Sequence, residues 1–304
     1  MWKDHLAPLA ALLIMAITFT SPILFSGKRL AGHDTVQWRA MAEDAIQYEE
    51  QTGEKALWVN NLFGGMPSYL INGNKVVPNV DTIVSQINRL AHPFGLTIVM
   101  LLGTYAAGLL LTGRRSSGLL AALFFSFTTY LPVILSAGHN SKYATLAYAP
   151  LIIAGFLYVL RKRSLFSMAL FALALGLQLR AGHIQISYYL AIGMAIWFSF
   201  EIVQRIRQGN SKEALNITLL LIGGAVLGIG MMAQPLLSQI EYKDFSIRGS
   251  NLGGGDGTLA WDYAMAWSQG IGELLTMLVA NAFGGSGMTY WGPKPGTSGP
   301  HYVG

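Results

Sequence analysis

The chain has 304 residues, of which 52% are hydrophobic and 12% charged, and its mean hydropathy is +0.43. Soluble domains carry about 25% charged residues, so the composition excludes an ordinary soluble enzyme, a disordered chain and a nucleic-acid binder with a charged soluble surface. The net charge of +5 is expected to reflect membrane topology, and the absence of cysteine excludes disulfides, thiolate metal sites and a cysteine nucleophile.

Apolar residues fall in blocks that predict membrane-spanning helices. A bilayer core about 30 Å thick needs roughly 20 apolar residues as a helix, and backbone groups in lipid must bond within the segment. Seven segments are predicted in chain order: 6–25, 95–111, 118–136, 144–160, 165–179, 184–203 and 214–236. The first is long for a signal-peptide core and lacks a good cleavage site, so we expect it to be retained. The predicted fold class is an all-α integral membrane protein.

Lysine and arginine residues orient these segments. They gather in the loops after the second, fourth and sixth segments: Arg114, Arg115, Arg161, Lys162, Arg163, Arg205, Arg207 and Lys212. The positive-inside rule places these short loops and the N-terminus in the cytoplasm. Residues 26–94, 137–143, 180–183 and the chain after about 239 then lie outside, and the two short outer loops carry one cation each, Lys142 and Arg180. The expected location is the inner (cytoplasmic) membrane of a bacterium, with several passes.

The predicted organisation is a polytopic membrane domain over 1–236 and an extracytoplasmic region over 237–304. The first outer loop is too long for a passive connector, and it contains an expected surface helix at 41–51 and a tight turn at 60–67. The apolar stretch 272–283 is too short to span and predicts an interfacial or re-entrant helix. A flexible turn is expected at 253–257. Because the chain ends within a Gly/Pro-rich loop, a truncated fragment is expected.

The tripeptide Ala-Gly-His occurs three times, at 31–33, 137–139 and 181–183, in a chain with six histidines. On the predicted topology each copy ends a helix that runs outward. Glycine beside each histidine would let a ligand or another backbone come close. The copies place scarce polar residues at one membrane depth, where such groups indicate a functional site by default. Whether the three copies converge depends on helix order, which the sequence does not give.

The chemistry of this set favours phosphate binding beside a carboxylate. Asp34 is a candidate general base or metal ligand, and Lys142 and Arg180 could neutralise a phosphate. The imidazoles could donate hydrogen bonds or bind a metal, so a divalent cation is one option. Aromatic faces in the outer segments could stack on sugar rings: Trp38, Trp58, Trp261, Trp267 and Trp291. The candidate substrate-binding residues are His33, Gln37, Trp38, His139, Asn140, Lys142, Arg180, His183 and Gln185.

Each of these features has a simpler alternative. Asp34 could be only a helix cap, and Lys142 and Arg180 could extend to the membrane interface without binding anything. The histidines could be satisfied packing residues in helix-end turns, because three histidines on separate loops have no diagnostic metal spacing. The tryptophans could form an interfacial belt.

Longer motifs resemble a known family. They are GHDTVQW, TGEKALWVNNLFGGMPSY, SFTTYLPVILSAGHNSK, RAGHIQISYYL, QIEYKDFSIRG and WDYAMAWSQGIGELLTMLVANAFGG. These stretches, from the first segment to about Gly285, resemble the YfhO family of bacterial membrane proteins in the form found in Bacteroidetes-type bacteria. That family is grouped with GT-C membrane glycosyltransferases. Its members continue beyond the length of this chain with further helices and an outer domain.

The resemblance implies sugar transfer from a polyprenyl-phosphate donor at the outer face. It makes Asp34 the candidate catalytic residue, because GT-C enzymes carry an essential acidic residue soon after the first helix. A DxD motif would need a second acidic residue near Asp34, but Gln37 and Trp38 occupy the nearby positions. This departure weakens the expectation that a metal ion is required. The implied partners are membrane lipids, the lipid-linked sugar and a cell-envelope polysaccharide or glycolipid acceptor, with no nucleic acid. The alternative is a transporter, flippase or assembly factor that binds lipid-linked sugars without catalysis. Against a transporter, no inverted repeat is visible.

Overall fold

The computed structural model describes residues 3–71, 80–246, 261, 265–266, 268–285 and 289–295. The turn expected at 253–257 and Trp267 lie outside these residues. The chain forms two compact units. The first unit comprises Met1–Arg29, Pro78–Phe127 and Asn140–Met232, and the second comprises Leu30–Val77, Thr128–His139 and Ala233–Gly304. These two packing units differ from the two predicted regions, 1–236 and 237–304.

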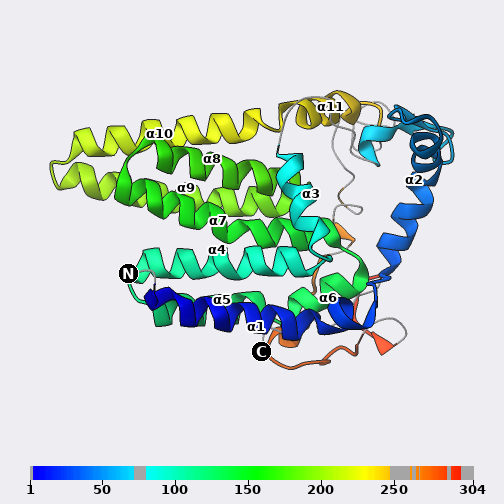
Figure 1. The fold of residues 1–304 in the computed structure, drawn as a ribbon, viewed down its shortest axis with the longest axis horizontal. Coiled ribbons are helices and arrows are strands. Elements are labelled where there is room, and N and C mark those ends of the chain that lie inside the picture. Colours follow the sequence, from blue (N-terminus) through cyan, green and yellow to red (C-terminus); the bar gives the residue numbers. More distant parts are fainter. Residues whose placement is uncertain are drawn as a thin grey trace. The chain divides into compact units, whose positions relative to one another are not determined.

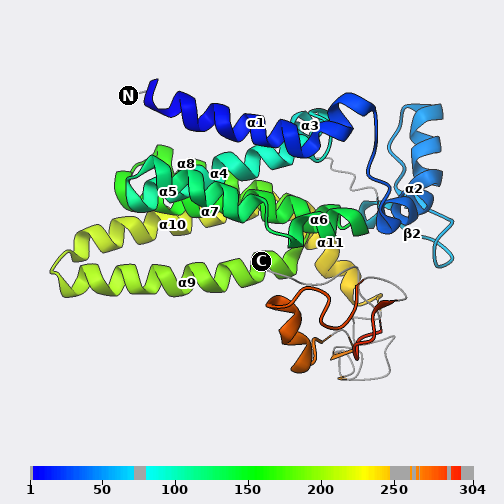
Figure 2. The ribbon, with the colours of Figure 1, turned by 90° about the horizontal axis from the view of Figure 1, so that it is seen from below.

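The first unit is a bundle of helices that run back and forth (Figures 1 and 2). Its helices are α1 (Lys3–Ser26), α3 (Asp81–Arg89), α4 (Phe94–Thr112), α5 (Arg115–Ser126), α7 (Asn140–Lys162), α8 (Leu165–Arg180), α9 (Ile184–Arg207) and α10 (Ser211–Gly230). The α4–α5, α7–α8 and α9–α10 connections lie at the end of the bundle that carries the N-terminus. The basic loops therefore share one end, as the positive-inside pattern predicts for successive crossings. The side of the membrane to which that end belongs stays a prediction.

Six helical stretches among the described residues are long and apolar enough to cross a membrane. They are Asp4–Ser26, Phe94–Thr112, Arg115–Ala137, Asn140–Lys162, Ile184–Arg207 and Ser211–Gly230. The segment predicted at 165–179 forms α8, whose 16 residues rise about 24 Å, less than a bilayer core of about 30 Å. The prediction of an all-α membrane protein is confirmed at this level, and a seventh crossing stays a prediction.

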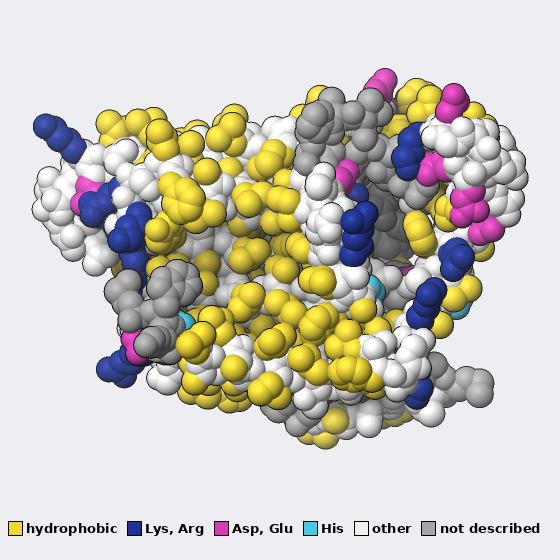
Figure 3. Space-filling view, in the orientation of Figure 1, with side chains coloured by type: hydrophobic (Ala, Val, Ile, Leu, Met, Phe, Trp, Pro, Cys, Tyr) yellow, Lys and Arg dark blue, Asp and Glu magenta, His cyan; other side chains and the backbone are white. Residues whose placement is uncertain are grey.

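The first unit buries one central helix and exposes apolar side chains on other helices, as expected for a bundle in lipid. Helix α7 is the most buried of the candidate spans, whereas no residue in the apolar window of α9 is fully buried. Exposed side chains on α9 and α10 are themselves large and apolar, including Ile196, Phe200, Leu219 and Val226. Figure 3 shows hydrophobic side chains across the visible face of this bundle. An apolar exterior of this extent marks a surface that lipid covers.

Glycine allows two of the helix pairs to pack closely. A Cβ added to Gly118 of α5 would lie 2.7 Å from the Tyr105 carbonyl oxygen of α4. A Cβ added to Gly228 of α10 would lie 2.9 Å from the Ala172 carbonyl oxygen of α8. Small residues that let backbones approach are typical of helix contacts in membranes, so Gly118 and Gly228 have a packing role here.

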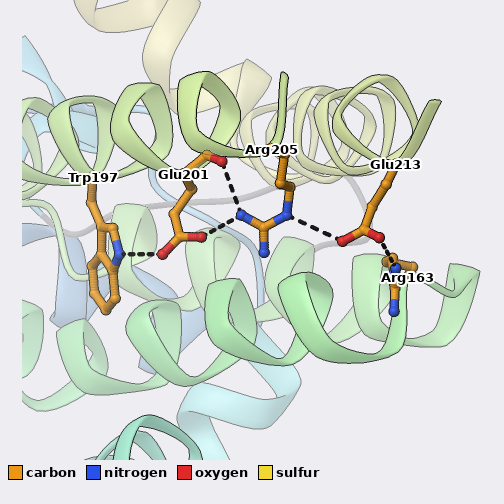
Figure 4. Close-up of polar contacts among 5 residues, drawn as sticks. All are labelled: Arg163, Trp197, Glu201, Arg205 and Glu213. Carbon is orange, nitrogen blue, oxygen red and sulfur yellow. Dashed lines mark hydrogen bonds and ion pairs between the residues drawn. The ribbon is translucent and has the colours of Figure 1, made fainter. Parts of the chain in front are cut away.

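A chain of charged side chains joins α9 and α10 to the α7–α8 turn (Figure 4). Arg205 pairs with Glu201 one turn earlier, and its Nε lies 3.2 Å from Oε1 of Glu213 on α10. Glu213 also pairs with Arg163 of the turn, and Trp197 Nε1 donates to Glu201 over 3.2 Å. The two arginines and two glutamates balance in charge, so the half-buried groups satisfy one another.

Replacing Arg205 with methionine is expected to lower the free energy of unfolding by about 2 kcal/mol. The change leaves the half-buried carboxylates of Glu201 and Glu213 without the cation between them. Thermal unfolding of the detergent-solubilised chain measures the loss. Arg207→Met, on the exposed side of the same helix, serves as the control and should change the unfolding temperature little. Equal effects of the two variants would show that the network adds no stability.

The second unit holds a helix, a small hairpin and loop structure. Helix α2 (His33–Thr52) precedes strands β1 (Trp58–Val59) and β2 (Met66–Pro67), which pair antiparallel, and the 3₁₀-helix η1 (Ser68–Leu70). Helices α6 (Tyr130–Ala137) and α11 (Ala233–Lys243) and the 3₁₀-helix η2 (Gly272–Met277) complete the described elements of the unit. The turn predicted at 60–67 is confirmed for 60–65, which connect the two strands, whereas Met66 and Pro67 form β2.

Two predicted boundaries were wrong. The surface helix expected at 41–51 begins at His33, so it already contains Asp34. The segment predicted at 214–236 ends at Gly230 before α11 begins, although apolar residues continue through Met231 and Met232. The segment predicted at 118–136 lies within the candidate span Arg115–Ala137, which has a short break at Phe127–Thr129 between α5 and α6.

A buried carboxylate organises the described C-terminal residues. The Glu273 side chain is only 2% exposed and accepts hydrogen bonds from the Gly270 backbone N–H, at 2.8 Å, and from the Tyr290 hydroxyl. Lys294 Nζ lies 3.6 Å from the same carboxylate. Burial acts to raise the pKa of Glu273, but these hydrogen bonds and the lysine charge outweigh it and hold the pKa below its ordinary value.

This carboxylate predicts acid sensitivity of residues 268–285 and 289–295. Because the pKa is lower in the folded state, ionised Glu273 stabilises the fold fully above the ordinary value of 4.5. That contribution falls below pH 4.5 and is lost once the pH passes the folded pKa. Hydrogen exchange of this segment is expected to accelerate over that window in the native chain. In Glu273→Gln exchange should be fast at every pH, whereas Glu50→Gln, exposed on α2, should match the native profile. A native profile without this acid transition would contradict the assignment.

Candidate functional site

Asp34 lies in the first turn of α2. Gly32 is the N-cap of this helix and its carbonyl accepts the Thr35 and Val36 amides at 3.0 and 3.1 Å. Asp34 is therefore not the N-cap residue, and no side-chain capping hydrogen bond forms at this helix start. A carboxylate in the first turn is still favoured by the helix dipole. The capping alternative for Asp34 thus has no support in this geometry.

The carboxylate of Asp34 meets a histidine more than a hundred positions away. His139 Nε2 lies 3.0 Å from Asp34 Oδ2, and His33 Nδ1 lies 3.7 Å from Asp34 Oδ1. Both imidazoles therefore lie within ion-pair distance of the Asp34 carboxylate. Two of the three Ala-Gly-His copies therefore contribute their histidines to one carboxylate.

Close approach of two glycines makes this contact. A Cβ on Gly32 would lie 2.4 Å from the Gly138 nitrogen, and one on Gly138 would lie 2.8 Å from the Thr35 nitrogen. Gly138 also ends α6 with φ +89, where its amide and that of His139 bond back to Leu135 and Ile134. The expectation that glycine beside histidine permits a close backbone approach is confirmed for these two copies. Gly182 of the third copy has φ +82 but nothing within 4 Å of an added Cβ.

The Asp34 side chain is 50% exposed and that of His139 is 26% exposed. A carboxylate that is held on one side and open on the other can accept a proton from a hydroxyl brought to it. The His139 imidazole contacts Oδ2 of the carboxylate, and half of the Asp34 side chain stays accessible to an incoming group. The role of Asp34 as a general base stays a prediction that this exposure permits.

The other candidates of the second unit lie along α2 and in its loops. Gln37 Nε2 lies 3.4 Å from His33 Nε2, and Trp38 Nε1 donates to the Ile71 carbonyl at 2.8 Å. Trp38, Trp58, Trp261 and Trp291 are all exposed. Exposed indole faces suit sugar stacking and an interfacial belt equally, so both interpretations of the tryptophans stay open.

The remaining candidates belong to the first unit. Arg180 forms an ion pair with Asp81 of α3, and Asn140 Oδ1 accepts a hydrogen bond from His92 Nε2 at 3.0 Å. His183 is the N-cap of α9, and Gln185 Nε2 donates to the Tyr189 hydroxyl at 3.2 Å. Lys142 is half-buried in the first turn of α7. The phosphate-binding roles of Lys142 and Arg180 stay predictions.

Two residues of this region were missed by the sequence analysis. Asp81 neutralises Arg180, and His92 pairs with Asn140. Burial lowers the pKa of the His92 imidazole, and the hydrogen bond to Asn140 opposes part of that effect, so the neutral ring is favoured. His92 could have been noticed as one of only six histidines, whereas nothing in the sequence connects Asp81 with Arg180.

Metal ligands are sparse at the Asp34 site. Among the residues that the structure describes, no group of three or more histidine, aspartate or glutamate side chains is arranged to hold a metal ion. Asp34 and His139 together offer two donor groups, whereas stable transition-metal sites usually use three or more protein ligands. The contribution of a divalent cation stays a prediction that this geometry does not strengthen.

Comparisons with protein-family models, with curated proteins and with solved structures find no match to this chain. The functional assignment therefore depends on the geometry of the site and on the sequence motifs.

Proposed function

We propose that the chain is a membrane glycosyltransferase of the GT-C type that moves a sugar from a polyprenyl-phosphate donor to a cell-envelope acceptor at the outer membrane face. The observation that carries the proposal is the half-exposed Asp34 carboxylate, held 3.0 Å from His139 directly after the first membrane helix. The resemblance of the motifs around Asp34 to the YfhO family supports the same role.

In the proposed reaction, an acceptor hydroxyl approaches the half-exposed carboxylate of Asp34. The carboxylate takes the hydroxyl proton while the oxygen forms a bond to the anomeric carbon of the sugar, and the bond from that carbon to the phosphate oxygen breaks. The configuration at the anomeric carbon is inverted, and the polyprenyl phosphate leaves as an anion. Stabilising that anion calls for a cation, and Lys142 and Arg180 stay the candidates that the sequence offers for this role. His139 acts as a positioning residue for the carboxylate.

Purified protein in detergent tests the proposal directly. The chain is mixed with a radiolabelled polyprenyl-phosphate sugar and an extract of envelope glycolipids, and transfer of label to the acceptor is measured. Turnover that disappears in Asp34→Asn supports catalysis. Saturable binding of the donor without turnover would favour the alternative, a transporter, flippase or assembly factor, over the enzyme.

A further inference from the structure

A cavity lies among α7, α8, α9 and α10 of the first unit. Its volume is about 410 Å³, within the range of small-molecule sites. The deep wall is apolar and includes Ile152, Phe171, Met194 and Ala225. Ile184 and Tyr188 also line it and are strongly exposed, so the cavity opens on the helix surface that lipid covers.

Two polar side chains interrupt this apolar lining at one end. Gln178 in the last turn of α8 is 1% exposed, and Ser187 in the first turn of α9 is 9% exposed. Among the described residues, neither Gln178 Nε2 nor Ser187 Oγ has a hydrogen-bond partner. A buried donor without a partner is costly, and each such group in a native structure requires an explanation. An acceptor oxygen inside the cavity would satisfy both.

The position of the two donors defines the occupant. Both lie next to the α8–α9 turn, at the end of the helices, whereas the apolar wall extends toward the middle of the bundle. A molecule that fits must combine an alkyl chain with a hydrogen-bond acceptor near the membrane interface. The acceptor should be neutral, because the nearest cation on α8, Arg180, is already paired with Asp81.

We propose that this cavity binds one acyl chain of a glycerolipid, with the ester carbonyl accepting hydrogen bonds from Gln178 Nε2 and Ser187 Oγ. An ester carbonyl at the head of an alkyl chain lies at the boundary between headgroups and hydrocarbon, and the helix ends that carry Gln178 and Ser187 are expected near that boundary. This site is independent of Asp34 and of the proposed sugar transfer.

The test compares ester-linked and ether-linked lipids of one headgroup. The full chain, stripped of lipid in detergent, is titrated with dihexadecanoyl phosphatidylglycerol or with its di-O-hexadecyl analogue, and native mass spectrometry measures the retained lipid. The ether lipid lacks the carbonyl acceptor. The native chain is expected to bind the ester lipid about three- to tenfold more tightly.

Three variants complete the test. Gln178→Leu is expected to lower the ester preference and leave binding of the ether lipid unchanged, whereas Gln204→Leu, exposed on α9, should keep the full preference. Ala225→Phe fills the apolar wall and should weaken both lipids alike. Equal binding of the two lipids by the native chain, or a preference that is undiminished in both Gln178→Leu and Ser187→Ala, would overturn the proposal. If Gln178→Leu does not fold, the native comparison and Ser187→Ala still decide it.

Discussion

Replacing Asp34 with asparagine is expected to lower the rate of sugar transfer by about 10²- to 10⁴-fold, the range that a general base supplies. Asparagine keeps the size of the side chain and can still accept a hydrogen bond from His139, so the fold of α2 should persist. What it loses is the ability to take a proton from the acceptor hydroxyl. The effect should therefore fall on turnover and leave binding of the lipid-linked donor nearly unchanged.

The measurement pairs cells with purified protein. Sugar on the surface acceptor is measured in cells that express Asp34→Asn in place of the native chain, with protein levels compared by immunoblot. Glu43→Gln, an exposed acidic residue on the same helix, serves as the control and should retain full transfer. Unchanged glycosylation at normal protein levels would remove Asp34 from the mechanism.

His139→Gln separates positioning from catalysis. Glutamine keeps a donor for the Asp34 carboxylate but changes its reach and removes the imidazole. A smaller loss of turnover than in Asp34→Asn, with the donor still bound, is expected if His139 only orients the carboxylate. Complete loss equal to that of Asp34→Asn would mean that the two residues act as one unit, as interdependent catalytic groups do.

Hydropathy predicted the helices of the first unit well, because length and apolar content alone decide whether a segment can span a bilayer. The end of the last predicted segment at Gly230 was missed, because apolar residues continue through Met231 and Met232. The start of α2 at His33 was missed because the polar first turn has no apolar periodicity to mark it. The sequence thus predicted which segments are helical, but not where each helix begins or ends.

The candidate site shows the same limit. The repeated Ala-Gly-His sequence indicated that a ligand or another backbone could come close to Gly32 and Gly138. Only the fold shows that these two glycines approach each other and that His139 contacts Asp34. Arg180 was expected to be available for phosphate, and the structure places Asp81 beside it. A donor phosphate would therefore have to compete with that carboxylate. Sequence spacing has no information on contacts between positions a hundred residues apart.

The largest predicted effect on stability concerns the close approach of Gly32 to Gly138. Gly32 has φ −61 and ψ 146, which alanine adopts without strain, so Gly32→Ala tests crowding alone. Its Cβ would lie 2.4 Å from the Gly138 nitrogen and 2.5 Å from the Gly138 Cα. Because both contacts are backbone atoms, the two segments must separate, at a cost of about 1–3 kcal/mol. Separation would also pull His139 away from Asp34 and lower transfer.

Hydrogen exchange at residues 33–36 and 138–139 measures this separation, and faster exchange is expected in Gly32→Ala. The third Ala-Gly-His copy supplies a matched pair of variants. Gly138→Ala and Gly182→Ala carry nearly equal backbone strain, with φ of +89 and +82, but only Gly138 is crowded. Gly138→Ala should therefore destabilise the fold more than Gly182→Ala and accelerate exchange near Asp34. If both variants behave alike, and Gly32→Ala exchanges as the native chain does, the close contact that joins His139 to Asp34 does not form.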